Sequence, residues 1–347
     1  MSLRPRALRF AAALAVGLAL NTVCASAASL AVEVRPHRPC AMGLSGKING
    51  STPSIMAELV ARWRAVFASA QPGIQVEVPP PYGPPQGSLS PRLQEFLQGK
   101  SDFAFLSRDL TDVDTATYLT AHGRLPAIVD VAGGSWRRYG YVDPVVFIVH
   151  RSNPLRALNF RQLDALFSET RLRGAARPTH WGDFGVAAAW AIKPIHVLGA
   201  ASWDGDDSAR ARVVRERVLS TQGLNGRWRR DLQSGSGIEA DVPDRVAADP
   251  LAIGFTGLGH LPTGARVLMI VPDGGGQPIA PTYENVARMR YPLARTLKIA
   301  LVSPVRPELR EFVDFLVSRE GQRVVREQNI FLPLPPTQPQ TRGHCRD

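Results

Sequence analysis

The stretch covering residues 43–67 constrains the fold most, because a glycine-containing loop leads into an amphipathic helix there. Thr52 can cap that helix, and Pro53 follows at the first helical position, where the N–H group has no helical partner. Apolar residues then recur at helical spacing, at Ile55, Leu59, Trp63, Val66 and Phe67. The free N–H groups and the helix dipole favour an oxyanion beyond Gly50 and Ser51. An ordinary capped helix that binds nothing explains this stretch more simply.

Residues 1–27 have the pattern of an export signal. Three arginines precede an apolar run over residues 10–20, and the small residues Ala25-Ser26-Ala27 form a cleavage site. The run is shorter than the ~20 apolar residues that a membrane span needs. We therefore expect a soluble mature chain that is periplasmic or secreted.

Charge favours an anionic partner without identifying it. The chain of 347 residues has 41 basic and 30 acidic side chains. Residues 1–27 contain three arginines and no acidic residue, so the mature chain keeps 38 and 30. This balance suits an anionic ligand or a polyanionic surface. Basic residues are not interleaved with aromatic ones in a cluster, so we expect no nucleic-acid partner.

The cysteine content and the length of the chain limit the possible disulfides, metal sites and number of lobes. Cys40 and Cys345 lie near opposite ends of the mature chain, where they can pair in an oxidising compartment or remain independent thiols. Cysteine and histidine residues lack metal-ligand spacing, and we expect no cofactor. The roughly 320 residues of the mature chain exceed one comfortable core, which predicts two lobes.

Polar groups follow the predicted elements of the first half. A strand over residues 74–78 leads into a proline- and glycine-rich loop over 79–91, and a helix starts at Pro91. A buried strand over 102–106 ends at Ser107-Arg108-Asp109-Leu110. Ligands bind at the carboxyl edge of open α/β sheets, so this group is either a site or a turn with a surface ion pair.

The second half continues the alternation of strands and helices. Strands are predicted over 142–149, 195–198, 251–255, 267–271 and 297–302, and helices over 160–167 and 308–328. Ser236 and Glu239 fit a capping box. Ser208 can cap another helix, whose first turns carry Arg210 and Arg212. Basic residues are unfavourable near a helix N-terminus, so they indicate either a bound anion or simple solvent exposure.

Several motifs resemble the periplasmic phosphate-binding proteins of ABC transporters. The segment FRQLDALF at 160–167 lies between an Asn-Pro at 153–154 and Trp181, as in that family. DPLAIGF at 249–255 is similar to the family's "pGAIGY" strand, and PTYENV at 281–286 with YPLAR at 291–295 is similar to its "PT.eNv…YPL.R". EGQ at 320–322 and FLPL at 331–334 match its C-terminal pattern.

The resemblance implies a set of ligand-binding residues. Ser51 and Thr52 stand at the family's first phosphate loop, and Ser88 at its second. The remaining positions come from two strand or helix ends, namely Ser107, Arg108, Ser208 and Arg210.

Three departures distinguish this chain from the family's pattern. Residues 47–49 look inserted before the first loop. Arg108 stands where the family has an aspartate that accepts a hydrogen bond from protonated phosphate and repels sulfate, whereas an arginine there would stabilise any oxyanion. Ser208-Ala209-Arg210 replaces Ser-Gly-Thr, which adds a second positive charge.

The resemblance implies an α/β, type II periplasmic-binding-protein fold with two lobes, each a central mixed sheet flanked by helices. We expect lobe 1 at residues 41–144 plus 257–336, lobe 2 at 145–256, hinge crossings near Val145 and Ile253, and a flexible tail at 337–347. The implied function is capture of an oxyanion, phosphate first, for ABC-type uptake, with an inner-membrane permease as partner and a monomeric state. The alternative is a fold repurposed as a periplasmic sensor or partner-binding module. An enzyme is disfavoured because no nucleophile and base have recognisable spacing.

Overall fold

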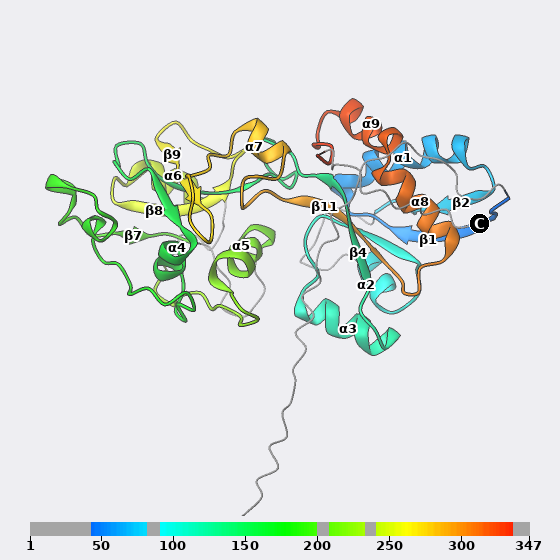
Figure 1. The fold of residues 1–347 in the computed structure, drawn as a ribbon, viewed down its shortest axis with the longest axis horizontal. Coiled ribbons are helices and arrows are strands. Elements are labelled where there is room, and N and C mark those ends of the chain that lie inside the picture. The colour runs from blue at the N-terminus through cyan, green and yellow to red at the C-terminus, as the bar shows by residue number, and fades with distance from the viewer. Residues whose placement is uncertain (1–42, 82–90, 200–207, 233–240, 336–347) are drawn as a thin grey trace, which may run out of the picture.

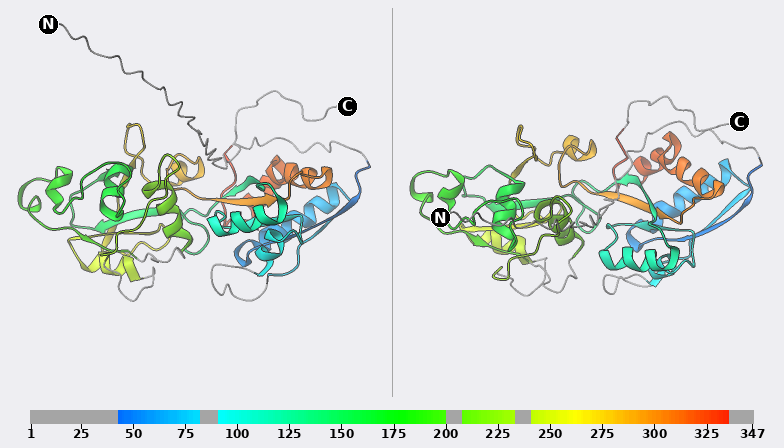
Figure 2. Two further views of the ribbon diagram at one scale, coloured as in Figure 1. Left: turned by 90° about the horizontal axis from the view of Figure 1, so that it is seen from below. Right: turned by 60° about the horizontal axis from the view of Figure 1, so that its bottom comes forward.

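The computed structural model describes residues 43–81, 91–199, 208–232 and 241–335. Within them the chain forms two α/β lobes that lie side by side (Figure 1). Two other orientations show the same two lobes, joined by a narrow connection that we call the waist and that consists of residues 134–144 and 288–295 (Figure 2). The export signal, both mature cysteines, Ser88, the Ser236–Glu239 capping box and the C-terminal tail lie outside the described residues.

Lobe 1 is built on a five-stranded mixed sheet of order β2-β1-β3-β11-β4. Its strands are β1 Gly46–Ser51, β2 Ile74–Glu77, β3 Phe103–Leu106, β4 Ala127–Gly133 and β11 Thr296–Leu301. Strand β1 runs parallel to β2 and β3, whereas β11 is antiparallel to β3 and β4. The carboxyl ends of β1 and β3 therefore meet at one edge of the sheet.

Helices cover both faces of this sheet. They are η1 Ser54–Met56, α1 Ala57–Ala70, α2 Pro91–Leu97, α3 Asp112–His122, α8 Pro307–Val317 and α9 Arg319–Gln328. On one face Phe103 and Phe105 of β3 join the core of α1, α8 and α9. On the other face Ala104 and Leu106 pack with α2 and α3. The two-residue period of a strand thus assigns the side chains of β3 to two cores.

Lobe 2 has a four-stranded sheet of order β7-β8-β5-β9 and a parallel pair, β10-β6. Its strands are β5 Val145–His150, β6 Ala157–Asn159, β7 His196–Val197, β8 Ala252–Gly257, β9 Ala265–Val267 and β10 Met269–Val271. Its helices are α4 Phe160–Phe167, η2 Trp181–Phe184, η3 Ala188–Trp190, α5 Ala209–Val214, the π-helix η4 Arg215–Leu219, α6 Val242–Ala248 and α7 Tyr283–Ala287.

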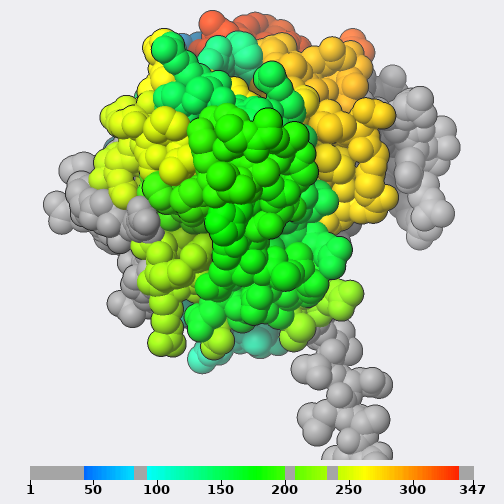
Figure 3. Space-filling model, turned by 90° about the vertical axis from the view of Figure 1, so that its left-hand side faces the viewer, coloured from blue at the N-terminus to red at the C-terminus, as the bar shows by residue number. Residues whose placement is uncertain are grey.

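The core of lobe 2 is separate from that of lobe 1. Phe147, Phe167 and Phe255 bring β5, α4 and β8 together, with ring centroids 5.3 to 6.1 Å apart. The end of this lobe that faces away from lobe 1 is covered in the middle by the chain around α4 and η2 (green), with the segment leading to α7 (orange-yellow) at one side (Figure 3). Each lobe therefore has its own apolar interior.

The second crossing lies later in the chain than the sequence predicts. We expected it near Ile253, but β8 is buried along its whole length and pairs with β5, and β9 pairs with β5 on the other side. Residues 257–287 therefore continue lobe 2, because their strands complete its sheets. The chain crosses between the sheets at 134–144 and again at 288–295, and a backbone hydrogen bond from Gly134 N–H to Arg295 O joins these two segments.

Two further predictions of local structure were wrong. Residues 46–51 form strand β1 instead of a loop, because they pair with strands on both sides. The predicted helix over 308–328 is two helices separated at Ser318, whose hydroxyl caps α9 by accepting from Gly321 N–H at 3.2 Å. Both α8 and α9 still pack on the sheet of lobe 1, as expected. Among the described residues no helix is both long and apolar enough to span a membrane.

Candidate functional site

The lobe 1 side of the site lies where β1 and β3 end together. Ser51 pairs with Ala104 of β3, and Ser107 follows β3 directly. Ser51 and Thr52 are buried, with 4% and 5% of their surface exposed. The parallel pairing thus brings three predicted site residues to one edge of the sheet.

Thr52 does not cap the first helix. Pro53 occupies the N-cap of η1 with an extended ψ of 152°, and no side chain caps either η1 or α1. The Thr52 hydroxyl instead donates to Pro53 O at 3.3 Å. An extended proline delays the helix by one position, so the predicted cap was wrong although Thr52 stays at the sheet edge.

Arg108 is turned toward the start of α3. Its guanidinium donates to Asp114 Oδ2 at 2.7 Å and to Asp109 O at 2.8 Å. The Asp114 side chain is 1% exposed and also completes the capping box of α3 with Thr111. The structure thus gives Arg108 an ion pair with a buried acid at the start of α3.

The lobe 2 side of the site is the beginning of α5, which faces lobe 1 (Figure 1). Ser208 caps α5 as predicted, since its hydroxyl accepts from Ala211 N–H at 3.1 Å. Arg210 lies over the ring of Tyr139, with 4.3 Å between Cζ and the ring centroid, and forms a 3.3 Å ion pair with Asp143. Both partners belong to the first crossing, so Arg210 connects lobe 2 to the waist.

Asp143 is a fully buried carboxylate. None of its side chain is exposed, and its Oδ2 accepts from Gly259 N–H at 2.8 Å. A Cβ at Gly257 would approach Asp143 Oδ2 to 2.2 Å. The absence of a side chain at Gly257, at the end of β8, is what lets Asp143 and Arg210 reach each other.

Arg295 lies between the two halves of the site. It is on the second crossing, 7% exposed, and its guanidinium donates to Ser107 O in lobe 1 at 3.4 Å. Burial lowers the pKa of Arg295 to about 10, and the positive charge of Arg210 adds to the effect, while Asp143 opposes it. Arg295 therefore remains charged at neutral pH, and it interacts with Ser107 of lobe 1 and with the charge of Arg210 in lobe 2.

Two carboxylates also approach from opposite lobes. Burial raises the pKa of Glu216 in η4 to about 7, and the negative charge of Asp109 in lobe 1 adds to the rise. Three arginines near Glu216 oppose it. Asp109 is itself 3.5 Å from Lys298 Nζ. The Glu216 residue as a whole is exposed although its surroundings desolvate the carboxylate, so water attenuates the repulsion from Asp109.

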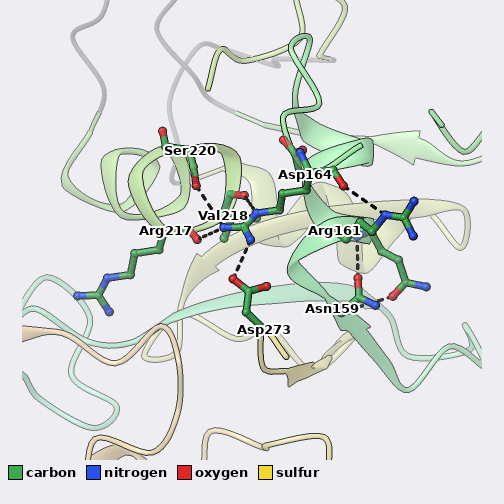
Figure 4. A network of polar contacts seen from close by, with 9 residues as sticks. Asn159, Arg161, Asp164, Arg217, Val218, Ser220 and Asp273 are labelled. Carbon is green, nitrogen blue, oxygen red and sulfur yellow. Dashed lines mark hydrogen bonds and ion pairs between the residues drawn. The ribbon is translucent and has the colours of Figure 1, made fainter. Parts of the chain in front are cut away.

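The π-helix that carries Glu216 is fixed at its far end. Arg173 donates to the carbonyl oxygens of Arg217, Val218 and Ser220 at 2.6 to 3.2 Å and pairs with Asp273 at 2.7 Å. Figure 4 shows these acceptors gathered at the end of the helix. One guanidinium thus satisfies the orphan carbonyls at a helix C-terminus. π-Helices are often found at functional sites.

Arg217 fastens the same π-helix to the second crossing. Its guanidinium donates to Ala294 O at 2.6 Å and to Pro292 O at 3.2 Å. The backbone of Arg295 is held as well, because its carbonyl accepts from Gly134 N–H at 2.8 Å. The segment that delivers the Arg295 side chain is therefore rigidly positioned.

Sequence reasoning did not select Arg295 or Asp143 as site residues. Arg295 is part of the YPLAR motif, and a charged residue within an otherwise apolar run was the available signal. Asp143 gave no comparable signal, because its role depends on Gly257 and Arg210, which are distant in sequence. Among the described residues no group of histidine, cysteine, aspartate and glutamate could hold a metal ion.

The chain that carries these site residues matches a known protein family. A family model described as a PBP superfamily domain matches residues 42–320. The chain belongs to the PBP superfamily. A Pseudomonas aeruginosa protein named phosphate-binding protein PstS is similar to this superfamily member, with 26% identity over 316 residues that cover 90% of each chain.

Solved structures show the same two-lobed α/β fold. An ABC-type phosphate transport receptor from Vibrio cholerae aligns with a TM-score of 0.51 and 17% identity, over 82% of this chain and 99% of that one. PstS from Borrelia burgdorferi aligns with a TM-score of 0.52 and 15% identity, over 84% of this chain and 100% of that one. At these identities the likeness establishes the fold of the PBP-superfamily chain.

Proposed function

We propose that this protein captures inorganic phosphate between its two lobes and delivers it to an ABC-type permease. The observation that carries the proposal is the similarity over nine-tenths of both chains to a protein named for phosphate binding. The geometry agrees with it, because buried hydroxyl groups of lobe 1 and a serine-capped helix of lobe 2 flank a positively charged waist. Such groups stabilise an oxyanion by hydrogen bonding and charge.

Binding is proposed to close the lobes about the two crossings at 134–144 and 288–295. Both segments lie between the sheets, and few residues would need to change their backbone angles. The proposed contacts are the predicted residues Ser51, Thr52, Ser88, Ser107, Ser208 and Arg210. Arg108, which was predicted with them, would contribute through the charge balance of the sheet edge while paired with Asp114.

Export is part of the same proposal. Residues 1–27 have the pattern of a cleaved signal, which would place the mature chain in the periplasm as a monomer that docks on its permease. The alternative, a sensor or partner-binding module that no longer serves phosphate uptake, is not favoured by the relatives named above.

Calorimetric titration of the mature chain tests the proposal. The protein would be unfolded and refolded to strip bound anion, then titrated with phosphate, sulfate and arsenate at two pH values. We expect micromolar or tighter binding of phosphate, and weaker binding after Ser51→Ala or Ser208→Ala, one substitution in each lobe. Ser69→Ala on the exposed end of α1 is the matched control and should change nothing. No heat with any of the three anions would refute the proposed function.

A further inference from the structure

Arg295 is a buried charge with little compensation. Only 7% of its surface is exposed, and its one hydrogen bond to a described residue, to Ser107 O, is long at 3.4 Å. Within the described parts of the chain its guanidinium makes no ion pair. Burying a charge is unfavourable unless it is paired and hydrogen-bonded, so natural proteins rarely leave a guanidinium in this state without a purpose.

The neighbouring acids are already committed. Asp143 and Asp109 have a favourable effect on Arg295, but the two Asp143 oxygens are bonded to Arg210 and to Gly259 N–H, and Asp109 lies 3.5 Å from Lys298 Nζ. Arg212 is a second buried arginine, at 4% exposed, and the charge of Glu216 acts on it when that carboxyl is ionised. Positive charge thus gathers around Arg295, where Arg210 and Arg217 add repulsion.

The position of Arg295 suits a ligand that joins the lobes. Its guanidinium reaches Ser107, at the edge of the lobe 1 sheet, and is electrostatically close to Arg210, in the first turn of α5 in lobe 2. The backbone of Arg295 is fixed by a hydrogen bond from Gly134 N–H, and the Arg217 guanidinium donates to the carbonyl oxygen of the preceding residue, Ala294. A preorganised donor loses little freedom when an anion binds.

We propose that Arg295 is the principal charge partner of the bound oxyanion, donating forked hydrogen bonds to two of its oxygens. This inference rests on the proposed function and assigns the chemistry of that site: a tetrahedral oxyanion is recognised by a planar guanidinium on the waist, in addition to the hydroxyl groups of the lobes. A guanidinium presents two parallel N–H groups that match two oxygens of phosphate or sulfate, whereas a lysine presents a point charge.

The test compares Arg295→Gln and Arg295→Lys with Arg290→Gln in the full mature chain. Arg290 is the matched control, because it lies on the same crossing but its side chain is 48% exposed and pairs with Glu284 at 2.8 Å. Calorimetry with phosphate and with sulfate gives the affinities, and thermal unfolding without anion gives the stability of each variant. We expect Arg295→Gln to weaken phosphate binding on the order of 100-fold and Arg295→Lys about 10-fold.

The phosphate and sulfate affinities of the variants show whether Arg295 binds the anion directly. A sulfate affinity that falls by the same factor as the phosphate affinity, with Arg290→Gln within about threefold of the parent, supports a direct charge role for Arg295. If the parent binds phosphate and Arg295→Gln binds it equally well, the inference fails while the proposed function stands. If Arg290→Gln weakens binding as much as Arg295→Gln, removing any positive charge from this crossing is enough to weaken binding, and the inference fails. A parent that binds neither anion refutes the proposed function and the inference together. If Arg295→Gln does not fold, Arg295→Lys decides on the same criteria.

Discussion

Replacement of Asp143, the buried acid at the waist, should show how much the ion pair with Arg210 contributes to the free energy of unfolding. Asp143→Asn keeps an oxygen that can accept from Gly259 N–H but removes the negative charge opposite Arg210. At 3.3 Å and an effective dielectric constant near 20, the lost Coulomb attraction is about 5 kcal/mol. Part of this is offset because the carboxylate charge no longer has to be desolvated, although that of Arg210 still does, so we expect the free energy of unfolding to fall by about 2–4 kcal/mol.

A second aspartate provides a matched control for this substitution. Asp273→Asn removes an ion pair with Arg173 that has a shorter distance, 2.7 Å, but the Asp273 side chain is 59% exposed. Arg173 also keeps its three carbonyl acceptors. The exposed pair should therefore be worth less than about 1 kcal/mol.

Thermal unfolding followed by circular dichroism, without anion, measures both variants. A loss of 2–4 kcal/mol corresponds to a midpoint lower by roughly 5–10 °C for Asp143→Asn, with a change of no more than about 2 °C for Asp273→Asn. Equal shifts for the two variants would refute the argument that burial, rather than distance, decides the contribution of these pairs.

Three further predictions follow from packing, titration and capping. In Gly50→Ala the new Cβ would lie 2.3 Å from a ring carbon of Phe103, so urea unfolding should show a loss of about 1–3 kcal/mol; an unchanged midpoint would contradict the packing. Because Glu216 has a pKa of about 7 in the fold against 4.5 unfolded, the native state binds the proton more tightly, and stability should fall as pH rises from about 4.5 through 7. Glu216→Gln should remove that part of the pH profile, and identical profiles for variant and parent would show that burial and Asp109 do not raise the pKa of Glu216 in the fold. Ser208→Ala should cost about 1 kcal/mol through loss of the cap, measured by urea unfolding in the absence of anion, and a variant as stable as the parent would argue against that cap.

Local patterns were sufficient to predict elements that carry their own signals. Helix α4 was predicted from its apolar spacing, and the structure adds a capping box made by Asn159 and Gln162. The buried strand β3 and the cap at Ser208 were likewise predicted from neighbouring residues alone. In each case the decisive contacts lie within a few positions in the chain.

Features that depend on distant residues were missed. Strand β1 contains two glycines and a lysine, and it is a strand because β2 and β3 pair with it from both sides. Gly50 is needed there because the ring of Phe103 leaves no room for a Cβ. The second crossing was misplaced for the same reason, since only pairing with β5 shows that β9 belongs to lobe 2.

The residues of the candidate site also differ in whether local sequence signals are enough to predict them. Ser51 and Ser208 could be proposed from helix starts and Ser107 from a strand end, which are local signals. The pairing of Arg108 with Asp114 could not, because it requires the position of α3 relative to the end of β3. The role of Arg295 required both lobes to be placed around the waist.

A crystal structure of the mature chain grown with phosphate tests the central claim most directly. We predict a phosphate ion between Ser107 of lobe 1 and Ser208 of lobe 2, with the Arg295 guanidinium about 3 Å from two of its oxygens. Phosphate found only on the outer surface, at a concentration that saturates the calorimetric signal, would contradict the claim that the waist between the lobes is the binding site.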